Sequence, residues 1–133
     1  DLKEFVFPWH KRIVEVIHNA QKPAILHSCG NYTMIFDDLL ALGYDARHSY
    51  EDNIVPVEQA YEQFAGKMAV LGGIDVNYLI TASEYEITAR CKKMLDRASS
   101  RGGYALGSGN SIPDYVPDEK YFALLRAIGD KQW

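Results

Sequence analysis

Apolar residues recur at helical spacing in several segments of the chain, and the first segment begins close to the amino terminus. The apolar stripes that predict helices are Trp9, Ile13, Val16, Ile17 and Ala20; Ile35, Leu39 and Leu42; Val57, Ala60, Tyr61 and Phe64; Ile87, Cys91, Met94, Leu95 and Ala98; and Tyr121, Leu124, Leu125 and Ile128. Pro8 suits the first turn of the first helix, and Gly43 closes the second. Because Thr81 and Glu84 have capping-box spacing, we expect the fourth helix to begin at Thr81.

Short runs between these helices predict strands. Three of the runs are apolar and read "AILHS" at 24–28, which suits a buried strand, "KMAVLGGI" at 67–74 and "GGYALG" at 102–107. The more polar segment "DARHSY" at 45–50 is a further strand candidate. The order is one helix followed by four strand-helix units, which predicts an α/β fold with a parallel sheet.

Two architectures fit this order of elements. An eight-fold strand-helix barrel of the TIM type usually takes about 250 residues, so four units would make about half of one. An open half-barrel would leave two sheet edges and an apolar inner face exposed, and two copies could then associate through them. The alternative is a small doubly wound sheet that is complete in itself.

Composition and charge exclude several classes of protein. Of the 133 residues, 47% are hydrophobic and 24% are charged, as in an ordinary globular domain. The net charge is -4 and its residues are interspersed, which argues against a nucleic-acid-binding protein. With no signal-peptide pattern and no apolar run of about 20 residues, we expect a cytoplasmic protein without a membrane partner. Two cysteines are too few for a disulfide framework, so we expect reduced thiols.

His27 and Cys29 carry the clearest candidate chemistry. Residues two apart in a strand project to one face, so both side chains would lie together at the carboxyl end of their strand. Active sites of parallel sheets lie at that end, and imidazole and thiolate are good zinc ligands. Glu51 and Asp75 follow the next two strands and are candidate carboxylate ligands, while His48 lies in a strand with its orientation left open.

Each candidate also has a structural interpretation. A His-x-Cys pair arises often by chance. Glu51 and Asp75 could simply cap the helices that follow them. Cys91 lies on an apolar helical stripe and is expected to pack in the core, and His10 and His18 are expected at the surface.

Four ordered segments, "KPAILHSCGN", "LGYDARHSYED", "KMAVLGGIDVNYL" and "GGYALGSGNSIPDYVP", resemble the carboxyl-terminal half of the uroporphyrinogen decarboxylase family. That resemblance covers nearly the whole chain and implies half of a TIM-type barrel, with 1–133 forming one domain. It also implies that the chain, which opens at Asp1 without a methionine, is a piece of a longer protein and is inactive alone.

The family has two functional branches. Its decarboxylases act on uroporphyrinogen without a metal or organic cofactor, whereas its methyltransferases use zinc to activate a thiol that accepts a methyl group, often from a methyl-corrinoid protein. "HSCG" is similar to the methyltransferase branch, which implies that His27 and Cys29 bind zinc. The spacing from Cys29 to Glu51 is similar to that of a glutamate ligand in cobalamin-independent methionine synthase relatives. Asn110 departs from both branches, since methyltransferases carry a second cysteine near this position and decarboxylases carry a histidine.

We therefore expect zinc-assisted methyl transfer from a methyl-corrinoid to a thiol, and a corrinoid protein is a possible partner. Asp75 and Asn110 are the expected catalytic residues, Ser108 would line the substrate pocket, and Gly107 and Gly109 would give it room. Two alternatives stay open: metal-free decarboxylation of a tetrapyrrole-like acid, and a non-catalytic module that binds a corrinoid or tetrapyrrole.

Overall fold

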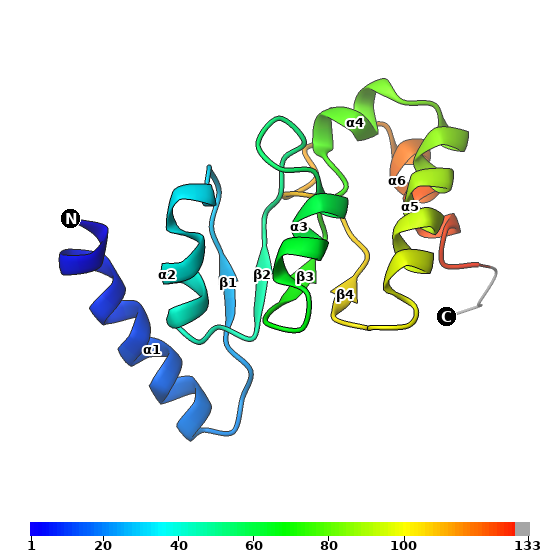
Figure 1. The fold of residues 1–133 in the computed structure, drawn as a ribbon. Coiled ribbons are helices and arrows are strands. Elements are labelled where there is room, and N and C mark those ends of the chain that lie inside the picture. The colour runs from blue at the N-terminus through cyan, green and yellow to red at the C-terminus, as the bar shows by residue number, and fades with distance from the viewer. Residues whose placement is uncertain (130–133) are drawn as a thin grey trace.

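Four parallel strands alternate with helices in the computed structural model, which describes residues 1–129 (Figure 1). In chain order the elements are η1 (Leu2–Val6), α1 (Phe7–Asn19), β1 (Ile25–His27), η2 (Thr33–Ile35), α2 (Phe36–Ala41), β2 (Ala46–His48), α3 (Val57–Phe64), β3 (Ala69–Leu71), α4 (Val76–Thr81), α5 (Glu84–Ala98), β4 (Tyr104–Ala105) and α6 (Asp118–Arg126). None of the helices in this part of the chain combines the length and apolar character needed to cross a lipid bilayer.

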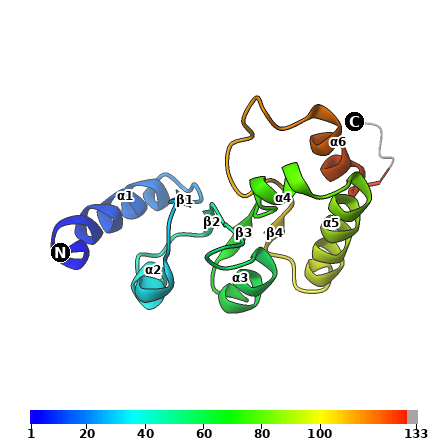
Figure 2. The same cartoon turned by 90° about the horizontal axis from the view of Figure 1, so that it is seen from above.

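The sheet has the order β1-β2-β3-β4, and every neighbouring pair is parallel. Helices α2 and α3 lie on one face of the strands, whereas the segment between β4 and α6 lies on the other side (Figure 2). Successive strands lie side by side because each connecting helix returns the chain to the same end of the sheet. The predicted succession of strand-helix units, and with it the half-barrel, is confirmed.

The predicted start of the fourth helix is wrong, and one helix was missed. The chain forms the short helix α4 before α5, and Thr81 is the last residue of α4. Its hydroxyl donates to the Asn77 carbonyl 2.9 Å away instead of capping a new helix. Ser83 is the true cap of α5 and forms the reciprocal capping box with Glu86. The signature Ser/Thr-x-x-Glu fits the sequence at both positions, so spacing alone could not choose between them.

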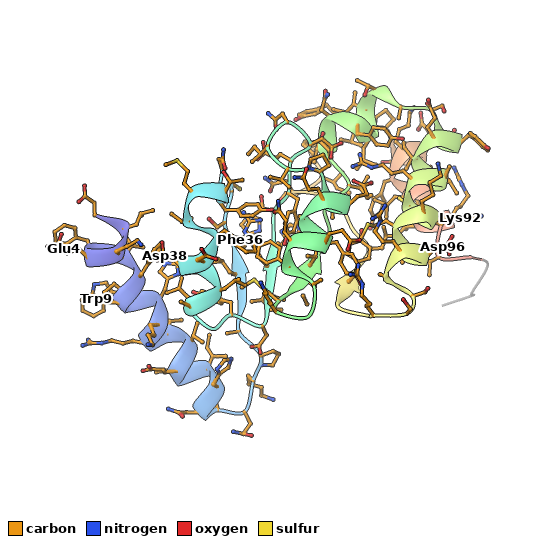
Figure 3. The ribbon with its side chains drawn as sticks, viewed as in Figure 1. Glu4, Trp9, Phe36, Asp38, Lys92 and Asp96 are labelled. Atoms are coloured by element: carbon orange, nitrogen blue, oxygen red, sulfur yellow. The ribbon has the colours of Figure 1, made fainter. Side chains whose placement is uncertain are left out.

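The predicted apolar stripes are buried in some helices and exposed in others. The predicted stripe of α3 is buried beside β3, and most of the predicted stripe of α5 is buried beside α6. Phe64, Cys91 and Met94 are fully inaccessible to solvent. In α1 the predicted stripe is largely exposed instead: Trp9 is 59% exposed and points away from the sheet (Figure 3). Val14 is the buried residue of α1, and it lies against the turn at Gly43.

Candidate functional site

Two histidines meet at the carboxyl ends of β1 and β2. The strand register places His27 beside His48, so both side chains project to the same face of the sheet. Their Nδ1 atoms are 2.7 Å apart, which is a hydrogen-bond distance. His48, whose orientation the sequence left open, therefore points toward His27.

Cys29 lies next to this pair and is exposed to solvent. Its Sγ is 3.6 Å from Nε2 of His27. The Ser49 hydroxyl and the Asn110 amide each donate to the same sulfur at 3.4 Å. The fold thus brings His27 and Cys29 together, as expected at the carboxyl end of their strand. It also brings Asn110 to them, which the family resemblance had singled out, and Ser49, which the sequence analysis missed.

Arg47 holds the ends of β1 and β2 together from the opposite face of the sheet. Only 1% of the residue is exposed, and its guanidinium donates to the carbonyls of Ser28 at 2.8 Å and Ser49 at 2.7 Å. The rings of Tyr32 and Tyr50 lie 4.2 and 4.8 Å from its central carbon, so the cation is held by aromatic faces as well. A charged residue at a buried strand position was the available signal for this role.

Burial of the phenol raises the pKa of Tyr50 to about 12, although the nearby Arg47 opposes the shift. The side chain is therefore neutral near pH 7 and does not serve as a general base there. Its contribution to the site is to pack against the guanidinium of Arg47.

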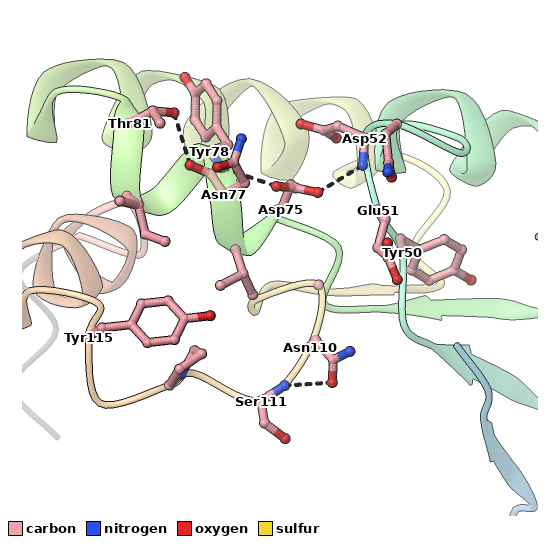
Figure 4. A pocket seen from close by; sticks show the side chains of 15 residues that line it. Tyr50, Glu51, Asp52, Asp75, Asn77, Tyr78, Thr81, Asn110, Ser111 and Tyr115 are labelled. Carbon is pink, nitrogen blue, oxygen red and sulfur yellow. Dashed lines mark hydrogen bonds between the residues drawn. The ribbon is translucent and has the colours of Figure 1, made fainter. Parts of the chain in front are cut away.

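A pocket of about 820 Å³ lies beside these residues, at the carboxyl ends of β2, β3 and β4 (Figure 4). Glu51, Asp75 and Asn110 line it, together with Gly109. His27 and Cys29 are not among its lining residues, so the pocket adjoins the thiol through Asn110. This is the end of the sheet at which the sequence analysis placed the site.

Asp75 acts as a helix cap, the alternative that its position after β3 also allowed. Its Oδ1 accepts from the backbone N–H of Tyr78 at 3.0 Å, at the start of α4. Its Oδ2 accepts from the backbone N–H of Asp52 at 2.9 Å and so ties the two loops together. The carboxylate also lines the pocket, and a catalytic role for Asp75 stays a prediction. Glu51 takes part in none of the ion pairs found within residues 1–129.

Glycines permit close backbone packing at this end of the sheet. A Cβ at Gly109 would lie 2.2 Å from the Tyr50 carbonyl oxygen, and one at Gly72 would lie 2.2 Å from that of Ser108. The Ser108 hydroxyl donates to the Asn110 carbonyl at 2.6 Å, which shapes the loop after β4. Gly109 lines the pocket, whereas Gly107 and Ser108 do not. Their expected roles toward substrate stay predictions.

His27 and Cys29 fit a zinc ion in both chemistry and spacing. Nitrogen and sulfur ligands at about 2.0 and 2.3 Å from a tetrahedral zinc lie about 3.5 Å apart. The distance of 3.6 Å between Nε2 and Sγ matches that separation, and it also suits a hydrogen bond from the thiol to the imidazole. Within residues 1–129, no three His, Cys, Asp or Glu side chains are gathered closely enough to hold a metal together. Glu51 as a third ligand stays a prediction.

Comparison with known proteins places this chain in a family. The family described as Uroporphyrinogen decarboxylase (URO-D) matches residues 1–130. The chain belongs to the URO-D family. It is 31% identical over 133 residues to the uroporphyrinogen decarboxylase of Anaeromyxobacter dehalogenans (strain 2CP-C), and 29% identical to that of Anaeromyxobacter sp. (strain Fw109-5). It spans 37% of the length of each of these relatives.

A solved structure shares the fold of this URO-D chain. The methyltransferase from Methanosarcina mazei superposes with a TM-score of 0.71 at 22% sequence identity, over 95% of this chain and 35% of that one. The family resemblance inferred from the four segments is confirmed, and the complete small doubly wound sheet is not the architecture of this chain.

Proposed function

We propose that the protein transfers a methyl group from a methyl-corrinoid to a thiol with the help of zinc. The observation that carries this proposal is the pairing of His27 Nε2 with the exposed Cys29 Sγ at 3.6 Å, at the open end of a barrel-type sheet. The fold neighbour with a TM-score of 0.71 is itself described as a methyltransferase, which agrees with this choice within the URO-D family.

In this proposal His27, Cys29 and Glu51 would hold a zinc ion, which would supply Lewis-acid activation of an incoming thiol. Asn110 and Ser49 donate to the Cys29 sulfur and so help to fix its position. Arg47 keeps the ends of β1 and β2 at a fixed separation through the two carbonyls that it binds. The adjoining pocket, at about 820 Å³, has room for a small thiol substrate.

The proposed methyl transfer requires no oxidant or reductant. The sulfur of the substrate thiol forms a bond to the methyl carbon while the carbon–cobalt bond of the donor breaks. The electron pair of that bond stays with cobalt, and the thiol proton leaves to solvent. A corrinoid protein would be the natural donor, and the rest of the longer chain would complete the pocket.

Decarboxylation of a tetrapyrrole-like acid is the second candidate, because the curated relatives are decarboxylases. The pocket disfavours it. Glu51, Asp52 and Asp75 line the cavity, and no lysine, arginine or histidine does within the described residues. A polyanionic substrate would meet carboxylates there, and Asn110 cannot exchange a proton as a histidine could. A module that only binds a corrinoid or tetrapyrrole is the third candidate.

Methyl transfer is tested with the full-length protein, methylcobalamin and a panel of small thiols, by following the visible spectrum of the cobalt. We expect demethylation in the wild type, retention of activity in Cys91→Ser, and a loss of at least about 100-fold in Cys29→Ser. Release of carbon dioxide from uroporphyrinogen without demethylation would assign decarboxylation instead. A spectral change on binding without either turnover would assign the binding module.

A further inference from the structure

His48 forms the middle of a hydrogen-bonded chain that ends at the Cys29 thiol. Its Nε2 is 3.2 Å from the carbonyl oxygen of Ser108, in the loop after β4. A carbonyl oxygen only accepts hydrogen bonds, so Nε2 of His48 must carry a proton to make this contact. The neutral imidazole then has an unprotonated Nδ1, which is an acceptor.

The hydrogen bonds also decide which ring nitrogen of His27 carries the proton. Its Nδ1 is 2.7 Å from the acceptor Nδ1 of His48, so Nδ1 of His27 must donate. Neutral His27 therefore keeps the lone pair on Nε2. That lone pair lies 3.6 Å from Sγ of Cys29, where it can accept the thiol proton or bind a metal ion.

Packing restricts the His48 ring to this position. A Cβ at Gly72 would lie 2.9 Å from both Cδ2 and Nε2 of His48, so the ring rests against the backbone of the residue after β3. Gly72 has a φ of +71°, a conformation that glycine adopts readily. Three strand ends thus fix the ring: β2 supplies it, the end of β3 supports it, and the loop after β4 accepts its proton.

We propose that His48 is a positioning residue that holds His27 in the Nδ1–H tautomer and so directs the Nε2 lone pair toward Cys29. The tautomer follows from the hydrogen-bond geometry alone. Only its consequence for zinc rests on the proposed function: partners that orient a ligating histidine typically change metal affinity by about 10- to 100-fold.

The test is selective ¹⁵N-histidine labelling of the full-length protein, with long-range ¹H–¹⁵N spectra recorded metal-free at mildly alkaline pH. In the wild type we expect His27 to show a protonated Nδ1 and an unprotonated Nε2. His48→Leu should shift His27 toward the Nε2–H form, and His48→Asn should restore the original form because its amide oxygen can accept. His18→Leu, which removes a half-buried histidine of α1 that contacts Asp45 and not His27, is the matched control.

A protonated Nε2 on His27 in the wild type, or an unchanged tautomer in His48→Leu, would overturn the proposal. Zinc titrations then separate this inference from the proposed function. A 10- to 100-fold weaker affinity in His48→Leu, with partial recovery in His48→Asn, would support both. If wild-type protein shows the expected tautomer but binds no zinc, the positioning role stands and the zinc assignment fails.

Discussion

Two neighbouring rows of side chains across the sheet have opposite surroundings. Leu26, Arg47 and Val70 are aligned by the strand register, and their exposures are 7%, 1% and 0%. One residue further along, His27 is exposed and His48 is half-buried on the other face. Because successive residues of a strand face opposite sides, a single step along the chain separates the row that stabilises the fold from the row that carries the chemistry.

The largest expected difference between the two faces comes from removing apolar side chains. Phe64 is fully buried and packs against the rings of Tyr32 and Phe36, so Phe64→Ala should lower the free energy of unfolding by about 3–5 kcal/mol. Ile25 lies on the same face of β1 as His27, the open face of the sheet, and is 54% exposed. Ile25→Ala should therefore lower the free energy of unfolding by under about 1 kcal/mol. Urea denaturation of the full-length protein measures both. Equal losses would contradict the difference between the two faces.

Arg47 is the charged member of the buried row formed with Leu26 and Val70. It should contribute nearly as much to the free energy of unfolding as an apolar core residue. Arg47→Leu leaves the Ser28 and Ser49 carbonyls without their donor and should cost about 2–3 kcal/mol by the same measurement. The control is Arg97→Leu, because Arg97 forms an exposed ion pair with Glu62 and should contribute under about 1 kcal/mol. A loss no larger than the control would contradict the role assigned to Arg47.

Gly72 and Gly66 offer a matched test of the contact behind His48. Both have a φ of +71°, but a Cβ at Gly66 would meet nothing within 4 Å. Gly72→Ala should therefore destabilise the protein by about 1–3 kcal/mol more than Gly66→Ala, because the two share the cost of the conformation but only one adds overlap. The difference in urea midpoint checks this. No difference would mean that the His48 ring and the Ser108 carbonyl can move away freely.

The smallest expected effect concerns pH and lies far from the open face. Burial opposes ionisation of Glu58, but hydrogen bonds from Arg90 outweigh it and hold the Glu58 pKa below its ordinary value of 4.5. At acid pH the Glu58 carboxylate is therefore protonated more readily in the unfolded chain than in the folded protein. The stabilisation, about 1 kcal/mol or less, is present above pH 4.5 and is lost as the pH falls through the folded pKa. Urea midpoints should fall less steeply with acid in Glu58→Gln than in the wild type, and identical slopes would exclude the effect.

The order of elements was predictable from sequence because it depends on local patterns. Apolar spacing located the strands and all the long helices, and it placed Cys91 in the core. The helix α4 was missed because the capping-box spacing from Thr81 to Glu84 placed the start of the next helix after it, although Asp75 had been recognised as a possible helix cap. Exposure of the α1 stripe at Trp9 could not be predicted, since periodicity identifies an apolar face without saying what covers it.

The site was predictable only in part, for a similar reason. The carboxyl-end rule placed His27 and Cys29 side by side, because strand ends follow from the fold. Only the family resemblance pointed to Asn110, which lies beside the same sulfur. The direction of His48 depends on register and on contacts with Ser108, which is distant in sequence. Such details arise when the chain is folded and have no local signature.

Zinc content tests the central claim most directly. The full-length protein, purified without a histidine tag, is measured by elemental analysis as wild type, Cys29→Ser and Cys91→Ser. The two cysteines form a matched pair, because Cys29 is exposed beside His27 whereas Cys91 is buried in α5. We predict about one zinc per chain in the wild type and in Cys91→Ser, and loss of the metal in Cys29→Ser. A wild-type protein without zinc, or a Cys29→Ser variant that keeps it, would contradict the account.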